Sequence, residues 1–312
     1  IHAHHILFDR GTEPSAEAMH IRWQDGIPCL FSHTHKDMLG FDVFAALFYM
    51  LSRYEEYRPD RLDAHGRFPA DASLAYRRKF LHLPVVDYWL RMLQQQLQYL
   101  FPRLPFPAPQ LHILPTLDID NAWAYRHKPV LRQVAGMAKQ LVQGQRRQLS
   151  QRLNILKGQE ADPYGHYHRI RDVHMNTGLH PVYFFQLSDY GKYDTNLPWR
   201  NKAYRQLIRQ TQEYAHVGIH PGYRAAQSAK RLQKEMRRLQ KITGQPVQRA
   251  RFHYIRLRFP FSYRMLLEAG IKEDYSLGFP DHYGFRAGTC RPFPFFDLQQ
   301  NTITSLTLYP FA

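Results

Sequence analysis

Short apolar runs alternate with longer amphipathic segments through the second two-thirds of the chain. Buried strands are predicted at residues 111–117, 181–187, 217–220, 250–254 and 271–276. Between them, apolar residues recur at helical spacing, at 129–156, at 201–214, at 225–242, at 262–269 and from Asp162 onward. Strands that alternate with helices form a parallel α/β sheet or barrel. Residues 277–296 are predicted to be loop.

The first third of the chain has a different pattern. Helices are predicted over residues 41–57 and from Pro84 to Leu100, and short strands at 6–8 and 27–31. Four prolines between residues 102 and 109 indicate a stiff linker. We therefore expect a smaller mixed α+β accessory domain over residues 1–108 and a larger α/β domain over residues 109–312.

Composition narrows the class of protein. A hydrophobic content of 44% in 312 residues is enough for a sizeable core, and no apolar run is long enough to span a bilayer. The first five residues do not resemble a signal peptide, which favours a cytoplasmic location. The absence of an initial Met suggests that the sequence begins inside a longer protein. Cys29 and Cys290 lie too far apart for a zinc ribbon or a disulfide framework.

The net charge of +16 suggests three kinds of partner: nucleic acid, an anionic glycan or an acidic membrane surface. Most basic clusters follow helical patterns, and such clusters usually mark a solvated helix face. Because no nucleic-acid-binding motif accompanies them, direct nucleic-acid function is not favoured. The sequence does not indicate an oligomeric state.

Two carboxylates end the first strand of the larger domain. Alternation along a strand directs Asp118 and Asp120 to the same side. Two nearby ionised carboxylates repel each other unless one is protonated or a cation lies between them. The simpler alternative is that one Asp caps the next helix and the other is solvated.

Other polar residues also follow predicted strands, where a parallel fold brings side chains to one face. They are His220, Arg251, His253, Asp274 and Arg286. Asp and His ligands with an open position suit a catalytic divalent metal, which lowers the pKa of a bound water to about 7. A carboxylate that does not bind the metal could act as base, with Arg keeping it ionised. Each His taken alone is more often a structural residue.

The order of these residues resembles a known family. Thr116-Leu117-Asp118-Ile119-Asp120, Gly218-Ile219-His220-Pro221 and Arg251-Phe252-His253-Tyr254 resemble the first three motifs of the polysaccharide deacetylases, the NodB-homology enzymes of carbohydrate esterase family 4. A Bacteroidetes-type subgroup carries an N-terminal domain of unknown function. Segments that resemble this subgroup lie at 41–44, 51–57, 66–68, 274–278 and 284–289.

The resemblance implies a distorted (β/α) barrel and metal-dependent removal of acetyl groups from a cell-surface or capsular glycan or its precursor. Asp118 would be the base and Arg251 would orient it, while Asp120 and His220 would bind the metal. Substrate contacts are expected from Tyr254, which would line the acetyl pocket, and from Asp274 and Arg286. The expected cofactor is a divalent metal, best matched by Zn²⁺, although Co²⁺ or Ni²⁺ would also fit.

Several positions depart from the family pattern. Arg224 stands where the second motif has another metal-binding His, and His253 stands where the third motif usually has Pro. We therefore expect His253 to be the replacement ligand, with His216 as a weaker candidate. The last motif, whose His acts as general acid, is absent, so either the sequence is truncated at its C-terminus or the acid is missing.

Two other functions stay open at this point. One is a catalytically inactive relative that binds a carbohydrate or an assembly partner, and the other is a basic scaffold for nucleic acid or an anionic membrane. The accessory domain is expected to cover the active face or to mediate assembly, without catalytic residues. Whether the cleaved bond is an amide or an ester also stays open.

Overall fold

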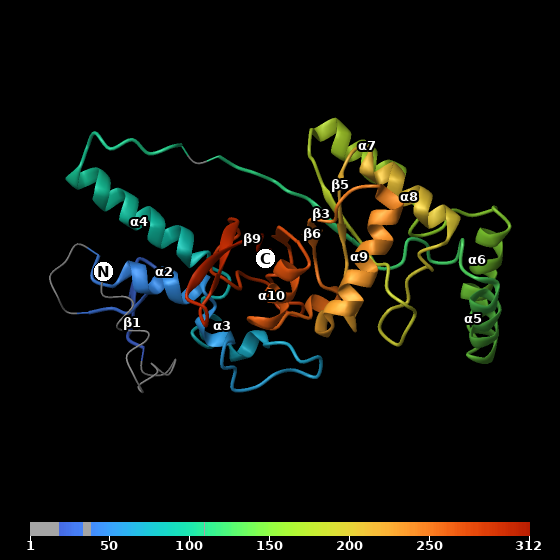
Figure 1. Ribbon diagram of the computed structural model, residues 1–312, viewed down its shortest axis with the longest axis horizontal. Helices are drawn as coiled ribbons and strands as arrows, with labels where there is room; N and C mark the ends of the chain where they lie inside the picture. Colours follow the sequence, from blue (N-terminus) through green and yellow to red (C-terminus); the bar gives the residue numbers. More distant parts are fainter. Residues whose placement is uncertain (1–18, 34–38, 109) are drawn as a thin grey trace. The chain divides into compact units, whose positions relative to one another are not determined.

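The computed structural model describes residues 19–33, 39–108 and 110–312 (Figure 1). The chain divides into two compact units, one made of the chain up to Leu111 together with Tyr254–Ala312, the other of His112–His253. The division into domains at 108/109 and the cytoplasmic location stay predictions, and the strand predicted at 6–8 lies outside the described residues. Across the described ranges, no helix has the length and apolar character needed to cross a bilayer.

The first unit begins with a hairpin of β1 (Ile21–Gln24) and β2 (Ile27–Leu30). Asp25 and Gly26 connect the strands, and both have positive φ, at 49° and 77°. Positive φ at both central residues is typical of the tight turn that suits the twist of a hairpin. The sequence predicted β2 but missed β1, because the Arg and Gln of β1 interrupt the apolar pattern.

Helices follow the hairpin. They are α2 (Val43–Leu51), η1 (Tyr54–Glu56), η2 (Ala70–Ala72), α3 (Leu74–Arg77) and α4 (Val85–Leu100). Asp42 caps α2, since its Oδ1 accepts from the Ala45 N–H at 2.9 Å. The helix predicted over 41–57 ends early because Arg53 adopts the left-handed conformation, with φ 54°. The helix predicted from Pro84 to Leu100 is confirmed.

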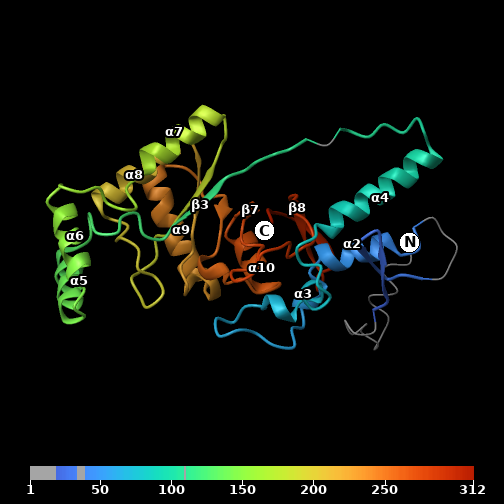
Figure 2. The same cartoon turned by 180° about the vertical axis from the view of Figure 1, so that it is seen from behind.

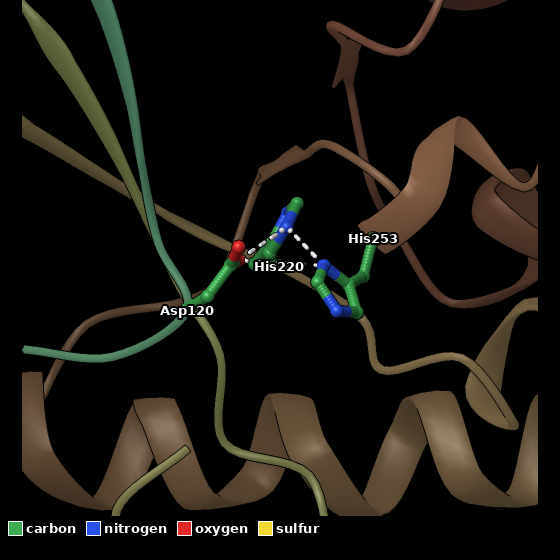
Figure 3. Close-up of side chains that lie close together, drawn as sticks. All are labelled: Asp120, His220 and His253. Carbon is green, nitrogen blue, oxygen red and sulfur yellow. Dashed lines mark hydrogen bonds and ion pairs between the residues drawn. The ribbon is translucent and has the colours of Figure 1, made fainter. Parts of the chain in front are cut away.

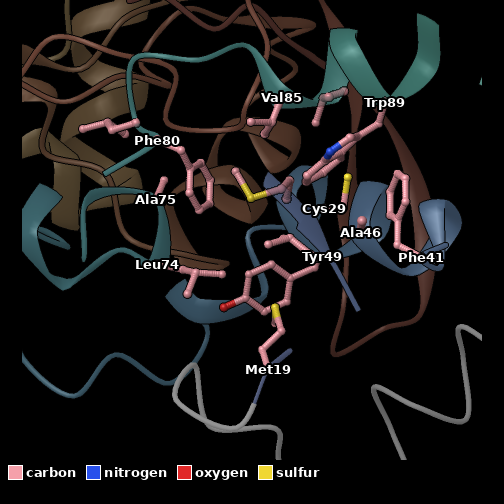
Figure 4. Packing of buried hydrophobic residues seen from close by; sticks show 14 of the residues in the cluster. Met19, Cys29, Phe41, Ala46, Tyr49, Leu74, Ala75, Phe80, Val85 and Trp89 are labelled. Atoms are coloured by element: carbon pink, nitrogen blue, oxygen red, sulfur yellow. The ribbon is translucent and has the colours of Figure 1, made fainter. Parts of the chain in front are cut away.

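The core of this unit includes Trp89 of α4 together with residues of α2, α3 and the hairpin (Figure 4). Trp89 is fully buried and donates its indole N–H to the Pro28 carbonyl at 2.8 Å, and its ring lies 6.1 Å from that of Phe41. Phe279, from the C-terminal segment, belongs to the same cluster. Segments distant in sequence therefore share one apolar core, as expected from the burial of large aromatic side chains.

The C-terminal segment adds η4 (His253–Ile255), α10 (Phe261–Glu268), β7 (Glu273–Asp274), β8 (Phe293–Asp297) and β9 (Thr302–Leu308). Within the first unit the strand order is β7-β9-β8, with β9 parallel to β7 and antiparallel to β8. The prediction of loop is confirmed for residues 277–292 but was wrong for 293–296, which belong to β8. Pro294 weakens the strand signal, although a proline is tolerated where the ladder has a bulge, as it has between Pro294 and Phe296.

The second unit contains four parallel strands, in the order β3 (Thr116–Ile119), β4 (Val182–Phe185), β5 (His216–Ile219) and β6 (Arg249–Ala250). Its helices are α5 (Val130–Val142), α6 (Arg146–Leu156), α7 (Tyr167–Thr177), α8 (Lys202–Gln212), η3 (Ala225–Gln227) and α9 (Ala229–Thr243). The four strands lie in the sheet in the same order as along the chain. With right-handed crossovers, this order places α7, α8 and α9 on one face of the sheet (Figure 2). The predicted α/β class is confirmed.

Three local predictions between Leu111 and Tyr167 need correction. Leu111 and Ile113 are 87% and 60% exposed, because only Thr116–Ile119 pairs with β4. The helix predicted over 129–156 is broken near Gly144, whose φ is 68°. The helix predicted at Asp162 begins only at Tyr167, because the Asp162 carboxylate accepts backbone N–H bonds from residues 124–126 instead.

Candidate metal centre

Asp120, His220 and His253 come together just beyond the carboxyl ends of β3, β5 and β6 (Figure 3). Asp120 Oδ1 lies 3.1 Å from His220 Nε2 and 3.3 Å from His253 Nδ1. The two ring nitrogens lie 3.0 Å apart. Because carboxyl ends of parallel strands meet at one edge of a sheet, three residues distant in sequence can share one small volume.

Backbone carbonyls set the orientation of both imidazoles. His220 Nδ1 lies 2.6 Å from the Arg251 carbonyl oxygen, and His253 Nε2 lies 3.0 Å from the Tyr193 carbonyl oxygen. A carbonyl can only accept, so each of these outer nitrogens carries the proton. In the neutral rings the inner nitrogens, His220 Nε2 and His253 Nδ1, then have lone pairs that point at Asp120. This is the tautomer arrangement that metal-binding histidines adopt.

Three electron-rich atoms therefore face one another. Asp120 Oδ1 is buried and receives no hydrogen bond, although both imidazoles are close to it. In a tetrahedral zinc site with bonds of about 2.0–2.1 Å, neighbouring ligand atoms would be about 3.3 Å apart. The observed separations of 3.0, 3.1 and 3.3 Å are close to that value. The donor set and its spacing therefore fit a divalent cation.

The pKa shifts at this site describe its metal-free state, in which a protonated imidazole can donate to Asp120. Burial alone would raise the pKa of Asp120, but the His220 and His253 imidazoles outweigh it and hold that pKa well below its usual range. Burial lowers the pKa of His253, but the Asp120 carboxylate outweighs it and the net pKa is raised. In the absence of a metal, a proton therefore binds between His253 and Asp120. A metal ion and a proton thus compete for His253.

Arg251 and Asp118 form a second pair beside these residues. Arg251 Nη1 lies 3.2 Å from Asp118 Oδ1, and Nη2 donates to Thr116 Oγ1 at 2.8 Å. The guanidinium also lies over the Phe184 ring, 5.0 Å from its centre. Thr116 and Asp118 share one face of β3, so a single Arg contacts both. The Asp118 side chain is 33% exposed, which leaves it accessible to water.

The loop after β4 supports His253 through a network that the sequence did not reveal. Asp194 Oδ1 accepts from Gln186 Nε2 at 2.7 Å and from the Tyr223 N–H at 2.9 Å. These bonds hold the loop whose Tyr193 carbonyl faces His253. Sequence motifs cannot reveal such a contact, because any residue supplies a backbone carbonyl.

Two alternative positions do not join the cluster. Arg224 is exposed, and His216 is exposed at the amino end of β5, whereas His220 follows its carboxyl end. His253 lies with Asp120 and His220 instead. The roles of Asp118, Asp120, His220, Arg251 and His253 stay proposals.

The predicted substrate contacts lie in the first unit. Arg286 is 1% exposed and forms an ion pair with Glu56, and the Asp274 carboxylate is buried and accepts from the N–H and hydroxyl of Ser276. The polar atoms of Arg286 and Asp274 therefore bond to other residues of that unit. These contacts do not support a substrate-binding role for either residue. Tyr254 is 37% exposed, and its role stays a prediction.

Comparisons with known proteins give little further information. Residues 1–102 match the model of a family of unknown function (DUF7033), which is less than half of the chain. No curated protein matches the chain. Among solved structures, one from Mycobacterium smegmatis, described as a "putative polysaccharide deacetylase", is 13% identical with a TM-score of 0.40. The match covers 67% of this chain and 62% of that one, and at this distance it carries no functional argument.

Proposed function

We propose that this protein is a metal-dependent hydrolase that removes acetyl groups from a glycan, built on a NodB-type barrel. The observation that carries the proposal is the convergence of Asp120, His220 and His253, whose inner lone pairs face one another at 3.0–3.3 Å. The Arg251–Asp118 pair next to them adds a carboxylate that is not part of the cluster. The acetyl group and the glycan come from the resemblance of the ordered motifs to the polysaccharide deacetylases.

Asp120, His220 and His253 would hold the divalent metal, for which Zn²⁺ is the best match to one carboxylate and two imidazoles. When bound, such an ion supplies Lewis acidity that polarises the acetyl carbonyl and makes water more acidic. The Tyr193 and Arg251 carbonyls would keep the imidazoles in the required orientation.

Asp118 would act as the base. It takes a proton from the water whose oxygen attacks the acetyl carbon, and it returns that proton to the sugar nitrogen or oxygen as the bond to the acetyl carbon breaks. The products are acetate and the free amine or alcohol. Arg251 would position Asp118 through its contacts with Asp118 and Thr116.

The test is acetate release from acetylated oligosaccharides, with amide-linked and ester-linked substrates, before and after addition of Zn²⁺. We expect release that depends on metal and is abolished by Asp118→Asn, which leaves the three proposed ligands intact. Asp172→Asn is the matched control, because Asp172 is exposed on α7. Metal binding without release from any acetylated glycan would overturn the hydrolase and favour the inactive, carbohydrate-binding alternative.

A further inference from the structure

A line of basic side chains runs along the exposed face of α9. Lys230, Lys234, Arg237 and Lys241 are all exposed, and their spacing of four, three and four residues places them on one face of the helix. At 1.5 Å per residue this line is about 16 Å long. The apolar residues of α9, among them Leu232, are buried. The polar face therefore carries almost only positive charge.

Three of these residues line a pocket of about 290 Å³. Its lining consists of Trp199, Arg200, Lys234, Arg237, Arg238 and Lys241. The guanidinium carbons of Arg200 and Arg238 lie 5.0 and 5.8 Å from the centre of the Trp199 ring. Cation–π contacts of this kind hold guanidinium groups in place. The pocket thus has one aromatic wall and five cationic side chains.

The positive charge of the pocket is not balanced. Asp189 accepts from Lys234 Nζ at 2.7 Å and pairs with Arg238. Within the described parts of the chain, no carboxylate lies in ion-pair range of Arg200, Arg237 or Lys241. Five like charges around one concave site repel one another, and an anion that enters the pocket would relieve that repulsion.

A single loop connects this pocket to the candidate metal centre. The loop between β4 and α8 contributes the Leu187 carbonyl, which accepts from Arg238 Nη1 at 2.6 Å. It then contributes the Tyr193 carbonyl, which faces His253, and finally Trp199 in the pocket wall. A ligand held by the pocket therefore contacts the segment that also orients a proposed metal ligand.

We infer that the pocket and the basic line on α9 bind the acidic groups of an anionic oligosaccharide. The inference rests on the proposed function, which it deepens by making the acetylated glycan an acidic one. Guanidinium groups bind carboxylates and sulfates through paired hydrogen bonds, and an aromatic wall suits a sugar ring. Single-stranded nucleic acid fits this pocket less well. Proteins that bind it use grooves with several successive aromatic side chains, and this pocket has one. Insertion into a membrane would need an exposed apolar face, which α9 lacks.

The test measures binding of a hexameric oligogalacturonate to the full chain by calorimetry, in EDTA, at two salt concentrations. The double variant Arg237→Gln/Lys241→Gln is compared with Arg146→Gln/Arg147→Gln, which removes two exposed charges from α6. We expect the α9 variant to weaken binding at least tenfold and to reduce the salt dependence by about two counterions. The α6 variant should change the affinity less than twofold.

Equal weakening by both variants would overturn the inference, since net charge alone would then explain binding. The inference would also be overturned if neutral cellohexaose bound with equal affinity. It would be overturned as well if DNA or phosphatidylserine vesicles bound more tightly, through the same α9 residues. Because binding is measured without hydrolysis, its result is separate from that of the acetate assay. Acetate release without acidic-oligosaccharide binding overturns this inference alone, and binding without release overturns only the hydrolase.

Discussion

His220 Nε2 and His253 Nδ1 lie 3.0 Å apart, although the outer nitrogen of each ring already faces a backbone carbonyl. Neither neutral ring then has a proton to place between the two nitrogens. The Arg251 and Tyr193 carbonyls create this situation, because they fix which nitrogen of each ring is protonated. Both carbonyls thereby direct the inner lone pairs toward Asp120, which is the orientation that the proposed metal site requires.

The first prediction concerns metal binding. His253→Gln should lower the affinity for Zn²⁺ by tenfold or more, because it removes one of three inward-facing donor atoms. We expect the wild-type chain to bind one equivalent of Zn²⁺, measured by elemental analysis and by competition with a chelator. His168→Gln is the control, since His168 is exposed on α7. Equal zinc content in wild type and His253→Gln would contradict the assignment of His253.

The second prediction concerns Arg251 as a positioning residue. Arg251→Gln should reduce kcat for acetate release by about 10²-fold, because Asp118 would lose the contact that orients it. Zinc content should not change, since His220 contacts the Arg251 backbone and not its side chain. Arg251→Lys should recover part of the rate, because it keeps the charge but not the fork that contacts Asp118 and Thr116. A drop in zinc content parallel to the drop in kcat would show a merely structural role.

The third prediction concerns the close approach of two loops. A Cβ added at Gly222 would lie 2.4 Å from Ser188 Cβ and 2.9 Å from its Oγ. Gly222→Ala should therefore destabilise the protein by about 1–3 kcal/mol and disturb the loop that carries the Tyr193 carbonyl. Gly191→Ala in the same loop is the matched control, because its Cβ would meet nothing within 4 Å. Thermal unfolding and zinc affinity should both separate the two variants, and equal behaviour would argue against tight packing at Gly222.

The fourth prediction is a pH dependence of stability. Burial raises the pKa of Glu235 from 4.5 to about 7, although its Oε2 accepts from the Gly222 N–H at 2.9 Å. The folded state thus holds this proton more tightly than the unfolded state. The contribution of Glu235 to stability is complete below pH 4.5, declines between pH 4.5 and 7, and is lost above pH 7. The free energy of unfolding should fall by about 3 kcal/mol in total over this range. Urea unfolding at several pH values should show this decline, and Glu235→Gln should remove it; identical pH profiles would refute the prediction.

The fifth prediction concerns the buried ion pairs of the first unit. Glu56 accepts from Arg53 Nε at 2.8 Å and pairs with Arg286, and all three side chains are about 1% exposed. Glu56→Gln would remove negative charge that faces two buried guanidinium groups. It should therefore destabilise the protein by about 3–5 kcal/mol. The exposed Asp60→Asn in the same unit is the control and should be close to neutral. Adding Arg286→Met to Glu56→Gln should restore part of the melting temperature, and no restoration would contradict the ion-pair explanation.

The alternation of apolar runs and amphipathic segments predicted the α/β class and most of the helices of the second unit. This worked because the period of a hydrophobic pattern depends on local geometry alone. The same alternation placed Asp120 and His220 at the ends of parallel strands, where side chains meet. The unusual pair of Arg224 and His253 pointed to His253, which lies with Asp120 and His220 in the structure.

Burial and long-range partners could not be predicted in this way. Leu111 and Ile113 form an apolar run that is nevertheless exposed, and Arg286 is polar but lies in the interior against Glu56. The hairpin of β8 and β9 depends on its own pairing, which Pro294 obscured in the sequence. In each case the outcome depends on which distant segment packs there, and no local pattern records that.

For the candidate site, the sequence by itself determined which side chains could bind a cation and on which strand ends they would lie. Only the tertiary structure decided the protonation pattern that makes them suitable, because it brought the Tyr193 and Arg251 carbonyls against the two imidazoles. The physical reason is that the chemical type of a donor is a property of one residue, whereas the direction of its lone pair is set by neighbours from elsewhere in the chain.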